Sequence, residues 1–563
     1  MLSQRLDLPE LLGRLLAARG LDAEAAADFL RPTLRALLPD PSRLVDMDAA
    51  AARLADAAQR GERVAVFADY DVDGACSGAL MVEALRGWGV TVTRAYVPDR
   101  IAEGYGPNAP ALERLMDEGA ALLVLVDCGI AAADVLRVAE GRADVVVLDH
   151  HKSEGDLPRI AAAVNPNRLD CPSGQRHLCA AGVAFLAAVA TNRELRRRGF
   201  FGAMRPEPDL KRLLDLVALA TVCDVVPLVG VNRAFVQQGL RVLAGRARPG
   251  LAALMDVAGS KDAPDSWTLG FALGPRINAG GRISVPDLGL RLLLEEDPLE
   301  ARAMAERLNE VNRRRQEVEA GVLMEALRLG EQQIQAGHAV LLVAGKGWHP
   351  GVVGIVAGRL RERFNRPSCV AGLDGAMAKG SGRSVPGLDL GAAVIAARQL
   401  GLVRFGGGHA MAAGFTAEPA RLDAFHAHLD ARLEAARHLP GVAELVLEGA
   451  LHARGATADL ARQVGRLSPF GSGNEEPVFA IARTRVVKAS RVGKEGATVR
   501  AFLEGEDGGR LKAVCFRAKD GPLADALLAP GQGPWTVAGH LRLDSWNGQD
   551  SPCLHLLDVA RPT

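Results

Sequence analysis

Between Arg63 and Asp149 the chain alternates four short apolar runs with stretches of helical character. The runs are VAVFADYD, TVTRAYV, ALLVLVDCG and ADVVVLDHH. Strand-length runs separated by helices are typical of βα units, which build a parallel sheet covered by helices. In such sheets ligands bind beyond the carboxyl ends of the strands. The alternation therefore predicts an α/β domain with a ligand site at one edge of its sheet.

Acidic and histidine side chains gather where three of these runs end, and a further acidic position follows later in the chain. They form four clusters: Asp69, Asp71 and Asp73 in DYDVDG, Asp127 in VDCG, Asp149, His150 and His151 in LDHH, and Asp224 in VCDVVP. Carboxylate oxygens are the ligands of Mg²⁺ and Mn²⁺, and added imidazole favours Mn²⁺. Without a cation the crowded carboxylates would repel one another, and some would stay protonated. The pattern predicts a divalent metal site.

Other chemistries are less compatible with the sequence. No GxSxG follows a strand, as a serine hydrolase would require, and no GxxxxGK[ST] loop is present. Cys128 lies in an apolar strand, which favours a packed thiol over a nucleophile. Any single acidic cluster could instead cap a helix or form a structural pair, so the metal hypothesis depends on the four clusters together.

Length and composition restrict the class of protein further. At 563 residues the chain is long enough for several domains. Its 67 basic and 67 acidic residues balance, so binding to nucleic acid would need local basic patches. The eight scattered cysteines indicate reduced, mostly buried thiols. Asp7 and Glu10 interrupt the first apolar stretch, and nothing later reaches the length of a membrane span, so we expect a cytoplasmic protein with no membrane partner.

The remaining patterns predict the order of the domains. A long polar helix, ERLNEVNRRRQEVEAGVLMEAL, precedes a second α/β pattern with a glycine-rich segment, and short strands separated by Gly and Asp turns follow. Strands of that kind favour a small β-barrel of the OB type. The predicted parts are an N-terminal helical segment (1–60), a catalytic α/β domain (61–295), a connecting helix (296–335), a second α/β domain (336–440) and an OB-like domain (441–563).

In their order, DYDVDG, VDCG, DHH and CDVVP resemble the four motifs of the DHH phosphoesterase superfamily. Further segments look like those of its RecJ family: PDRIAEGYG, LGPRINAGGRI, GWHPGVVGIVAGRL, GSGRSVPGLDL, RFGGGHAMAAGF and PFGSGNEEPVF. The resemblance extends from Arg63 to the end of the chain. It implies a DHH catalytic domain followed by a DHHA1-type substrate domain.

The function that the resemblance implies is a metal-dependent 5′ to 3′ exonuclease. It would act on single-stranded DNA, release 5′-mononucleotides, and serve DNA recombination and repair. A helicase and a single-strand-binding protein are candidate partners, and a monomer is expected. Two alternatives stay open: a DHH phosphodiesterase for oligoribonucleotides or cyclic dinucleotides, and a DNA-binding scaffold without catalysis.

The resemblance also implies roles for individual residues. The metal ligands would be Asp71, Asp73, Asp127, His150 and Asp224. They would hold two divalent cations, with Mn²⁺ preferred and Mg²⁺ the alternative, and such ions activate a water for in-line attack on a phosphodiester. Asp127 would bridge the ions, and His151 would face the substrate phosphate, which makes both of them catalytic. Asp69 would be a ligand or a hydrogen-bond acceptor, and Asp149 would orient the histidines or only support the structure.

Substrate contacts are expected from several segments. The candidates for the phosphate or the 5′ end are Arg100, Arg276, Ser384, His409, Gly407 and Gly408, with Arg282 and Arg383 as further candidates. Arginine suits phosphate oxygens, although each of these arginines could also form a structural ion pair. OB folds hold single strands through basic grooves and aromatic stacking. The candidates in the barrel are Lys488, Arg491, Arg500, Lys512 and Trp546, and the alternative for them is a solvated basic face.

Overall fold

The computed structural model describes residues 2–561 except 101, 153–156, 158, 443, 494–495, 517, 519–520, 530–532 and 547–548; the side chains of residues 522, 545 and 546 are also outside the description. The chain divides into two compact units. The smaller comprises Met1–Arg43, Arg212–Val242 and Leu445–Thr563, and the larger comprises Leu44–Lys211 and Leu243–Glu444.

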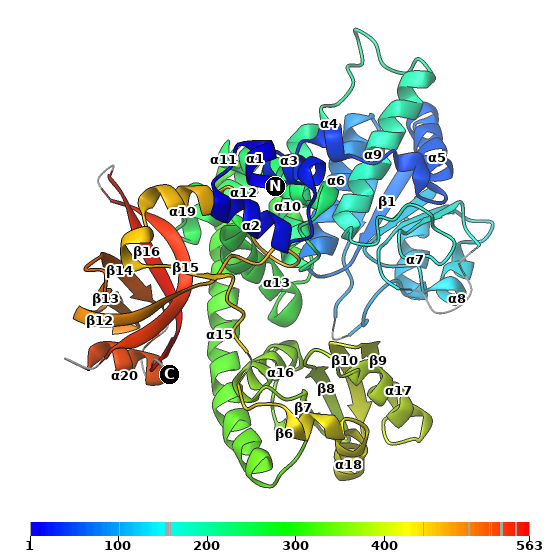
Figure 1. The fold of residues 1–563 in the computed structure, drawn as a ribbon. Helices are drawn as coiled ribbons and strands as arrows, with labels where there is room; N and C mark the ends of the chain where they lie inside the picture. Colours follow the sequence, from blue (N-terminus) through cyan, green and yellow to red (C-terminus); the bar gives the residue numbers. More distant parts are fainter. Residues whose placement is uncertain are drawn as a thin grey trace. The chain divides into compact units, whose positions relative to one another are not determined.

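The larger unit begins with a five-stranded parallel sheet in the order β2-β1-β3-β4-β5. The strands are β1 (Arg63–Ala68), β2 (Thr91–Tyr96), β3 (Leu122–Val126), β4 (Asp144–Leu148) and β5 (Ala162–Val164). Helices α5 (Met47–Arg60), α6 (Val72–Gly87) and α9 (Ala180–Arg197) cover one face of the sheet, and α7 (Ala109–Asp117) and α8 (Ala133–Leu136) cover the other (Figure 1). Because both faces are covered, β3 is buried along its whole length. The predicted α/β domain is confirmed.

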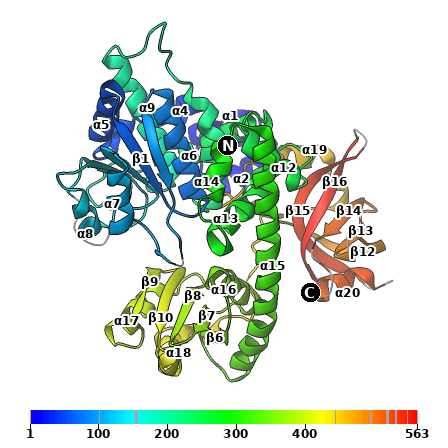
Figure 2. The same cartoon turned by 180° about the vertical axis from the view of Figure 1, so that it is seen from behind.

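A 38-residue helix, α15 (Pro298–Gln335), connects this sheet domain to the next. Asp297 caps its start by accepting hydrogen bonds from the amides of Leu299 and Glu300. Near its start α15 contacts α12 (Pro249–Val257) and α13 (Gly274–Ile283), and near its end it contacts α16 (Pro350–Phe364) (Figure 2). The short α14 (Leu288–Leu294) also packs against it.

The second sheet of the larger unit has the order β6-β7-β8-β10-β9, in which only β6 and β7 are parallel. The strands are β6 (Leu341–Lys346), β7 (Ser368–Asp374), β8 (Met377–Arg383), β9 (Phe405–His409) and β10 (Ala412–Ala417). Helices α17 (Leu390–Gln399) and α18 (Leu422–Arg432) share its hydrophobic core. This is the predicted second α/β domain.

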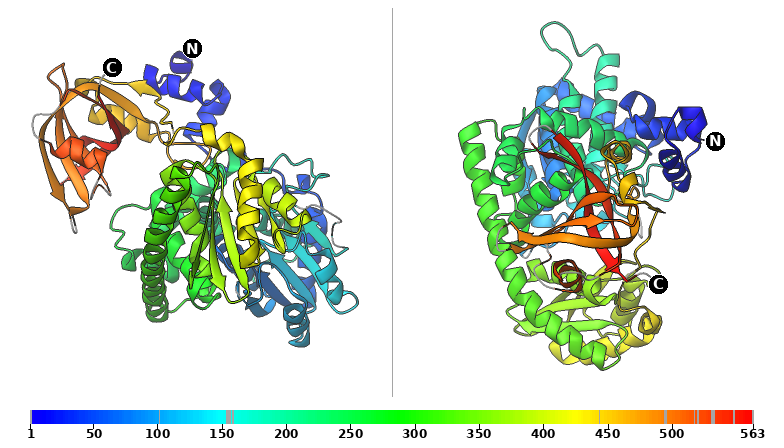
Figure 3. Two further views of the ribbon diagram at one scale, coloured as in Figure 1. Left: turned by 90° about the horizontal axis from the view of Figure 1, so that it is seen from below. Right: turned by 60° about the vertical axis from the view of Figure 1, so that its left-hand side comes forward.

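The smaller unit contains a β-barrel (Figure 3). Its strands are β12 (Phe479–Val492), β13 (Thr498–Glu504), β14 (Arg510–Cys515), β15 (Trp535–Trp546) and β16 (Gln549–Ala560), with the short β11 (Gly449–Ala450) beside β12. Pairing of β12 with β15 closes the five long strands into a barrel. The predicted OB-like barrel is therefore confirmed.

The N-terminal helices of the smaller unit pack with this barrel. Leu12, Leu16 and Phe29, from α2 (Glu10–Ala18) and α3 (Ala23–Leu30), belong to the same buried cluster as Phe479 of β12. The first helix, α1 (Leu2–Leu6), contributes partly buried leucines to this cluster. Helix α10 (Leu214–Cys223) and all but the last two residues of α11 (Gly230–Ala244) lie in the segment of the sequence between the two parts of the larger unit.

All eight cysteines are free thiols, and seven of them are buried, as their scattered spacing predicted. Among the described residues, no helix combines the length and the apolarity that crossing a bilayer requires.

Candidate metal centre

The turn from β1 into α6 positions the three aspartates of DYDVDG. Asp69 follows β1 directly, and Asp71 caps α6 by accepting a 3.0 Å hydrogen bond from the Gly74 amide. A Cβ atom at residue 74 would lie 2.3 Å from the Asp69 carbonyl oxygen, so only glycine allows this close turn. The motif therefore fixes two carboxylates at the edge of the sheet.

Asp73 is held by a second helix. Its buried carboxylate accepts hydrogen bonds from the amides of Ala180 (2.6 Å) and Ala181 (2.8 Å), at the N-terminus of α9. The exposed amides at a helix N-terminus favour a negative charge. These contacts fix the orientation of the Asp73 side chain.

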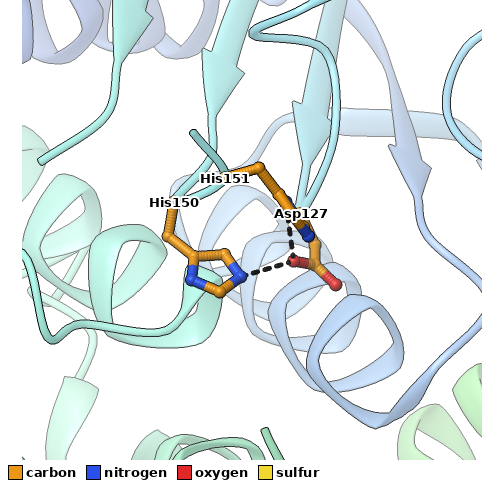
Figure 4. Close-up of side chains that lie close together, drawn as sticks. All are labelled: Asp127, His150 and His151. Carbon is orange, nitrogen blue, oxygen red and sulfur yellow. Dashed lines mark ion pairs between the residues drawn. The ribbon is translucent and has the colours of Figure 1, made fainter. Parts of the chain in front are cut away.

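Asp127 lies at the end of β3 with a backbone φ of +61°, in the left-handed region that few residues other than glycine adopt. Its amide donates to the Leu148 carbonyl oxygen at 3.1 Å, which keeps it against the end of β4. His150 Nε2 lies 3.3 Å from Asp127 Oδ1, and His151 Nδ1 lies 3.8 Å from the same oxygen (Figure 4). His150 Nε2 is also 3.7 Å from Asp73 Oδ2. The strand ends thus bring separate motifs together.

Asp149 is fully buried and accepts four hydrogen bonds. The donors are the amides of Ile130 (3.0 Å), His150 (2.7 Å) and His151 (3.1 Å), and Nδ1 of His151 (2.8 Å). Burial alone would raise the pKa of Asp149, but these bonds and the charge of His151 hold it below its usual value. Of the two roles predicted for Asp149, this geometry supports orientation of His151.

Burial and mutual repulsion make the metal-free carboxylates poor anions. Burial first, and then the charge of Asp71, raise the pKa of Asp73 to about 7 and the pKa of Asp69 well above its usual value. The pKa of Asp127 is raised by burial and then by Asp73. The Oδ1 atoms of Asp69 and Asp127 are buried without a hydrogen-bond partner. A bound cation would satisfy both oxygens and remove the repulsion.

His150 is suited to be a metal ligand because it is neutral. Burial, and then the nearby His151, lower its pKa to about 4. A hydrogen bond to the backbone of Leu178 opposes this lowering, so the ring is the donor in that bond. A hydrogen bond of this kind fixes the tautomer and leaves the other ring nitrogen as a ligand.

At these strand ends, two groups of ligand atoms lie within metal-binding reach, each with its atoms within 4.8 Å of one another. One group is Asp127, His150 and His151, and the other is Asp69, Asp71 and Asp127. Asp127 belongs to both, which fits the predicted bridging role, and the donor set of carboxylate and imidazole fits Mn²⁺. Asp224 follows the last residue of α10 in the smaller unit, and its role as a ligand stays a prediction.

The shifted pKa values predict how stability changes with pH. Because the pKa of Asp73 is higher in the folded chain than in the unfolded one, the metal-free folded chain binds more protons. The contribution of Asp73 to stability is therefore greatest at low pH and is lost as pH rises through about 7. A bound cation removes this loss, so we expect the rise in Tm on adding Mn²⁺ to be larger at about pH 8 than at about pH 6. Thermal melts with Mn²⁺ or with EDTA measure this difference; a rise that shrinks with pH would contradict it.

Three arginines lie close to one another near these carboxylates. Burial, and then the charge of Arg100, lower the pKa of Arg282 to about 10. The same two causes lower the pKa of Arg383. Arg282 donates to the Gly351 carbonyl oxygen at 3.0 Å, and the charge of Asp71 acts on it. The Arg100 guanidinium lies 5.1 Å from the centre of the Tyr70 ring.

None of these three, nor Arg276, forms an ion pair with a carboxylate within the described part of the chain. Grouped guanidinium groups without counter-ions form a site for an anion. Arg276 donates instead to Asn309 Oδ1 (3.0 Å) and to the Ala272 carbonyl oxygen (2.6 Å). Among the described residues, these guanidinium groups therefore form no direct ion pair, and the charge of Asp71 acts on Arg282 without one.

Of the other residues predicted to contact the substrate, some are packed inside the second sheet domain and others are accessible. The Ser384 side chain is buried, and its hydroxyl donates to the Leu388 carbonyl oxygen at 2.8 Å, so its position supports a structural role and not the predicted phosphate contact. Gly408 has a φ of +149°, and a Cβ atom there would lie 2.3 Å from the Ala412 carbonyl oxygen, so packing within the sheet explains this glycine. Gly407 has open space beside it, and His409 is exposed at the end of β9.

In the barrel, Lys488 and Arg500 are exposed, as a role in binding requires. Lys512 instead forms an ion pair with Asp544, and Arg491 donates to backbone carbonyl oxygens. The predicted Trp546 side chain lies outside the described residues.

Sequence reasoning missed two aromatic residues. Phe502 is 43% exposed and pairs across the strands with Lys488 on one side and Lys512 on the other. In ATVRAFLEG it lies two residues after Arg500, so both side chains point to the same face of β13, and this alternation could have identified Phe502 from the sequence. The Tyr105 hydroxyl lies 2.9 Å from His151 Nδ1 and 3.1 Å from the Asp127 carbonyl oxygen. No signal in the sequence predicted the Tyr105 contact, because it joins residues from three separate segments.

Comparison with known proteins agrees with this geometry. The sequence matches the DHH family N-terminal domain over residues 63–221, the DHHA1 domain over 335–435 and the RecJ OB domain over 447–558. A parallel sheet whose strand ends carry aspartates and a DHH triplet, followed by a DHHA1 domain, defines a DHH-type phosphoesterase.

The whole chain allows a narrower assignment. It is 39% identical to the single-stranded-DNA-specific exonuclease RecJ of Dickeya dadantii, over 95% of this chain and 93% of that protein. It is 37% identical to the Escherichia coli protein of the same name, over 96% and 93%. The crystal structure of Thermus thermophilus RecJ in complex with Mn²⁺ aligns with a TM-score of 0.82 and 30% identity, over all of this chain and 77% of that one. The chain belongs to the RecJ family.

Proposed function

We propose that this chain is an exonuclease that hydrolyses single-stranded DNA from the 5′ end and releases 5′-mononucleotides. The observation that carries the proposal is the position of Asp127, which belongs to two groups of candidate metal ligands and whose buried Oδ1 accepts no hydrogen bond. The names of the relatives, single-stranded-DNA-specific exonucleases, support the substrate class. Activity on single strands suits a role in DNA recombination and repair.

The proposed metal ligands are Asp71, Asp73, Asp127 and His150, with Asp224 from the smaller unit. Two divalent cations held there would activate a water and stabilise charge on the reacting phosphate. Mn²⁺ is preferred because imidazole is among the donors, and Thermus thermophilus RecJ has been solved with Mn²⁺ and with Mg²⁺.

The chain's own side chains bind and orient the substrate. Arg100, Arg282 and Arg383 would hold phosphate oxygens, since they lie together without carboxylate partners among the described residues. The Nδ1 atom of His151 is engaged by Asp149, so we propose that Nε2 is the atom that faces the phosphate. Tyr105 would keep that ring in place through its contact with Nδ1.

The barrel supports a polymeric substrate over a dinucleotide. Its strands β12 and β13 place Phe502 beside Lys488, with the exposed Arg500 on the same strand as Phe502. An aromatic ring flanked by basic side chains is how OB folds hold single strands without reading their sequence. A small-substrate phosphodiesterase would have no use for this module.

Cleavage of a single-stranded DNA labelled at either end tests the proposal. With Mn²⁺ we expect labelled mononucleotide to appear at once from the 5′-labelled strand and only late from the 3′-labelled one, and no product with EDTA. Blunt duplex DNA is expected to be a poor substrate. If strands survive while pApA or a cyclic dinucleotide is hydrolysed, the substrate class is wrong but the metal chemistry stands.

We expect Asp149→Asn to reduce this activity by about 10- to 100-fold, the usual cost of losing a residue that orients a metal site. The amide would replace one acceptor oxygen with a donor, which conflicts with the four donors that surround Asp149. Steady-state cleavage and Mn²⁺ titration of the same samples measure the effect. A variant that melts like the native chain and cleaves at the native rate would exclude the positioning role.

A further inference from the structure

Two large aromatic rings lie exposed and stacked on the larger unit. The centroids of Trp267 and Phe271 are 6.1 Å apart, the rings are inclined by 22°, and the side chains are 55% and 61% exposed. Trp267 precedes a π-helical turn, Thr268–Leu273, which continues directly into α13. π-Helical turns are rare and frequently occur at functional sites. Exposure of two rings of this size to water is unfavourable, and a flat partner that stacked on them would bury part of that apolar surface.

The same helical run leads to the metal centre. At its other end a Cβ atom on Gly281 would lie 2.6 Å from the Tyr70 carbonyl oxygen, so α13 packs against the DYDVDG motif. The next residue, Arg282, is close enough to Asp71 and Arg100 for their charges to change its pKa. At about 1.5 Å per residue, the aromatic pair and Arg282 are roughly 20 Å apart along the helix.

Between these ends the helix carries a further positive charge. Arg276 is half-buried and forms no ion pair within the described residues, and it donates hydrogen bonds to Asn309 and Ala272. One continuous helix thus presents two stacked rings, then a guanidinium group, then the arginine beside the metal ligands. Alternation of aromatic faces and cations is the arrangement that binds single-stranded nucleic acid.

We infer that Trp267 and Phe271 form a stacking platform for bases of the single-stranded substrate, on the 3′ side of the reacting phosphate. This inference depends on the proposed function, because it assumes that the 5′ end lies at the metal centre. A stacked strand rises about 3.4 Å per nucleotide, so the platform would contact bases roughly six nucleotides from that end, or fewer if the strand is extended. Substrates of two or three nucleotides would not reach it.

The test compares long and short substrates in the full chain. In Trp267→Ala/Phe271→Ala we expect the ratio of kcat/KM for a 20-nucleotide strand to kcat/KM for a trinucleotide to fall about 10- to 100-fold, the usual effect of losing base stacking. Trp267→Phe, which keeps an aromatic ring, should restore most of the ratio. Met324→Ala is the matched control, because Met324 is an exposed apolar residue of the same unit, and it should leave the ratio unchanged.

Binding of a labelled 20-nucleotide strand in EDTA, followed by fluorescence anisotropy, separates this inference from the proposed function. If the native chain neither binds nor cleaves DNA, the proposed function fails. If the native chain binds and cleaves DNA and the double variant does so with an unchanged ratio and affinity, the function stands and the platform is wrong. That second result would leave a protein partner as the occupant of the aromatic pair.

Discussion

Replacing Asp127 by alanine is expected to lower the rate of 5′-end cleavage by about 10³- to 10⁵-fold, the scale on which loss of a central catalytic group acts. Asp127 belongs to two groups of candidate metal ligands, so the substitution weakens both groups at once. It also removes the oxygen that lies 3.3 Å from His150 Nε2. End-labelled single-stranded DNA with saturating Mn²⁺ provides the measurement.

Two controls show whether the loss arises at the metal site. Asp127→Asn keeps the volume but removes the charge, and without metal we expect it to melt above the native chain because a buried, repelled carboxylate is gone. Asp134→Asn changes an exposed carboxylate of α8 and should have no effect on cleavage. An Asp127→Ala variant that retains a tenth of the native rate would exclude this residue as the shared ligand.

The second large effect is on stability. Arg233→Ala is expected to lower the free energy of unfolding of the smaller unit by about 3–5 kcal/mol, the cost of removing one partner from a buried charged network. The Arg233 side chain is almost fully buried and donates to the carbonyl oxygens of Phe29 (2.7 Å), Leu467 (2.7 Å), Ser468 (2.6 Å) and Pro469 (3.1 Å). Its guanidinium also lies 3.7 Å from the centre of the Phe29 ring. The substitution would remove one donor from each of these carbonyl oxygens, and within the described residues only those of Leu467 and Pro469 would keep a second donor, Asn474 Nδ2.

Urea denaturation, with hydrogen exchange to report on α2 and the barrel, measures this effect. Arg233→Met keeps the apolar stem and should still lose most of the stability, because the hydrogen bonds are the main contribution. The matched control is Arg241→Ala on the exposed side of the same helix, with an expected change within about 0.5 kcal/mol. A loss below about 1 kcal/mol for Arg233→Ala would contradict the argument.

Packing of the smaller unit also decides how the barrel is best tested. Truncation from about Val442 would remove Phe479 and the other barrel residues that share a core with Leu12 and Phe29. Such a chain would lose stability for reasons unrelated to DNA. Substitution of Phe502, which is exposed, is the cleaner test of the barrel.

The sequence by itself determined the features that depend on local patterns. Continuous apolar runs of strand length predicted the parallel sheet, whose strands are buried on both faces. A helical pattern predicted α15, and the alternation of short strands predicted the barrel, because burial of one face gives a periodic pattern in the sequence. The strand-end motifs predicted the aspartates and histidines, because the carboxyl ends of parallel strands share one edge. Asp127, His150 and His151 accordingly lie together.

Only the tertiary structure decided which side chains are engaged and which remain available. The sequence cannot distinguish the buried Ser384, which bonds within its own loop, from Arg282, which has no carboxylate partner among the described residues, since both occur in similar glycine-rich motifs. The four donors around Asp149 and the carbonyl oxygens around Arg233 come from distant segments. The same is true of the shared core of the N-terminal helices and the barrel. Such contacts depend on which distant segments meet in three dimensions, and the local periodicity of the sequence does not indicate which segments these are.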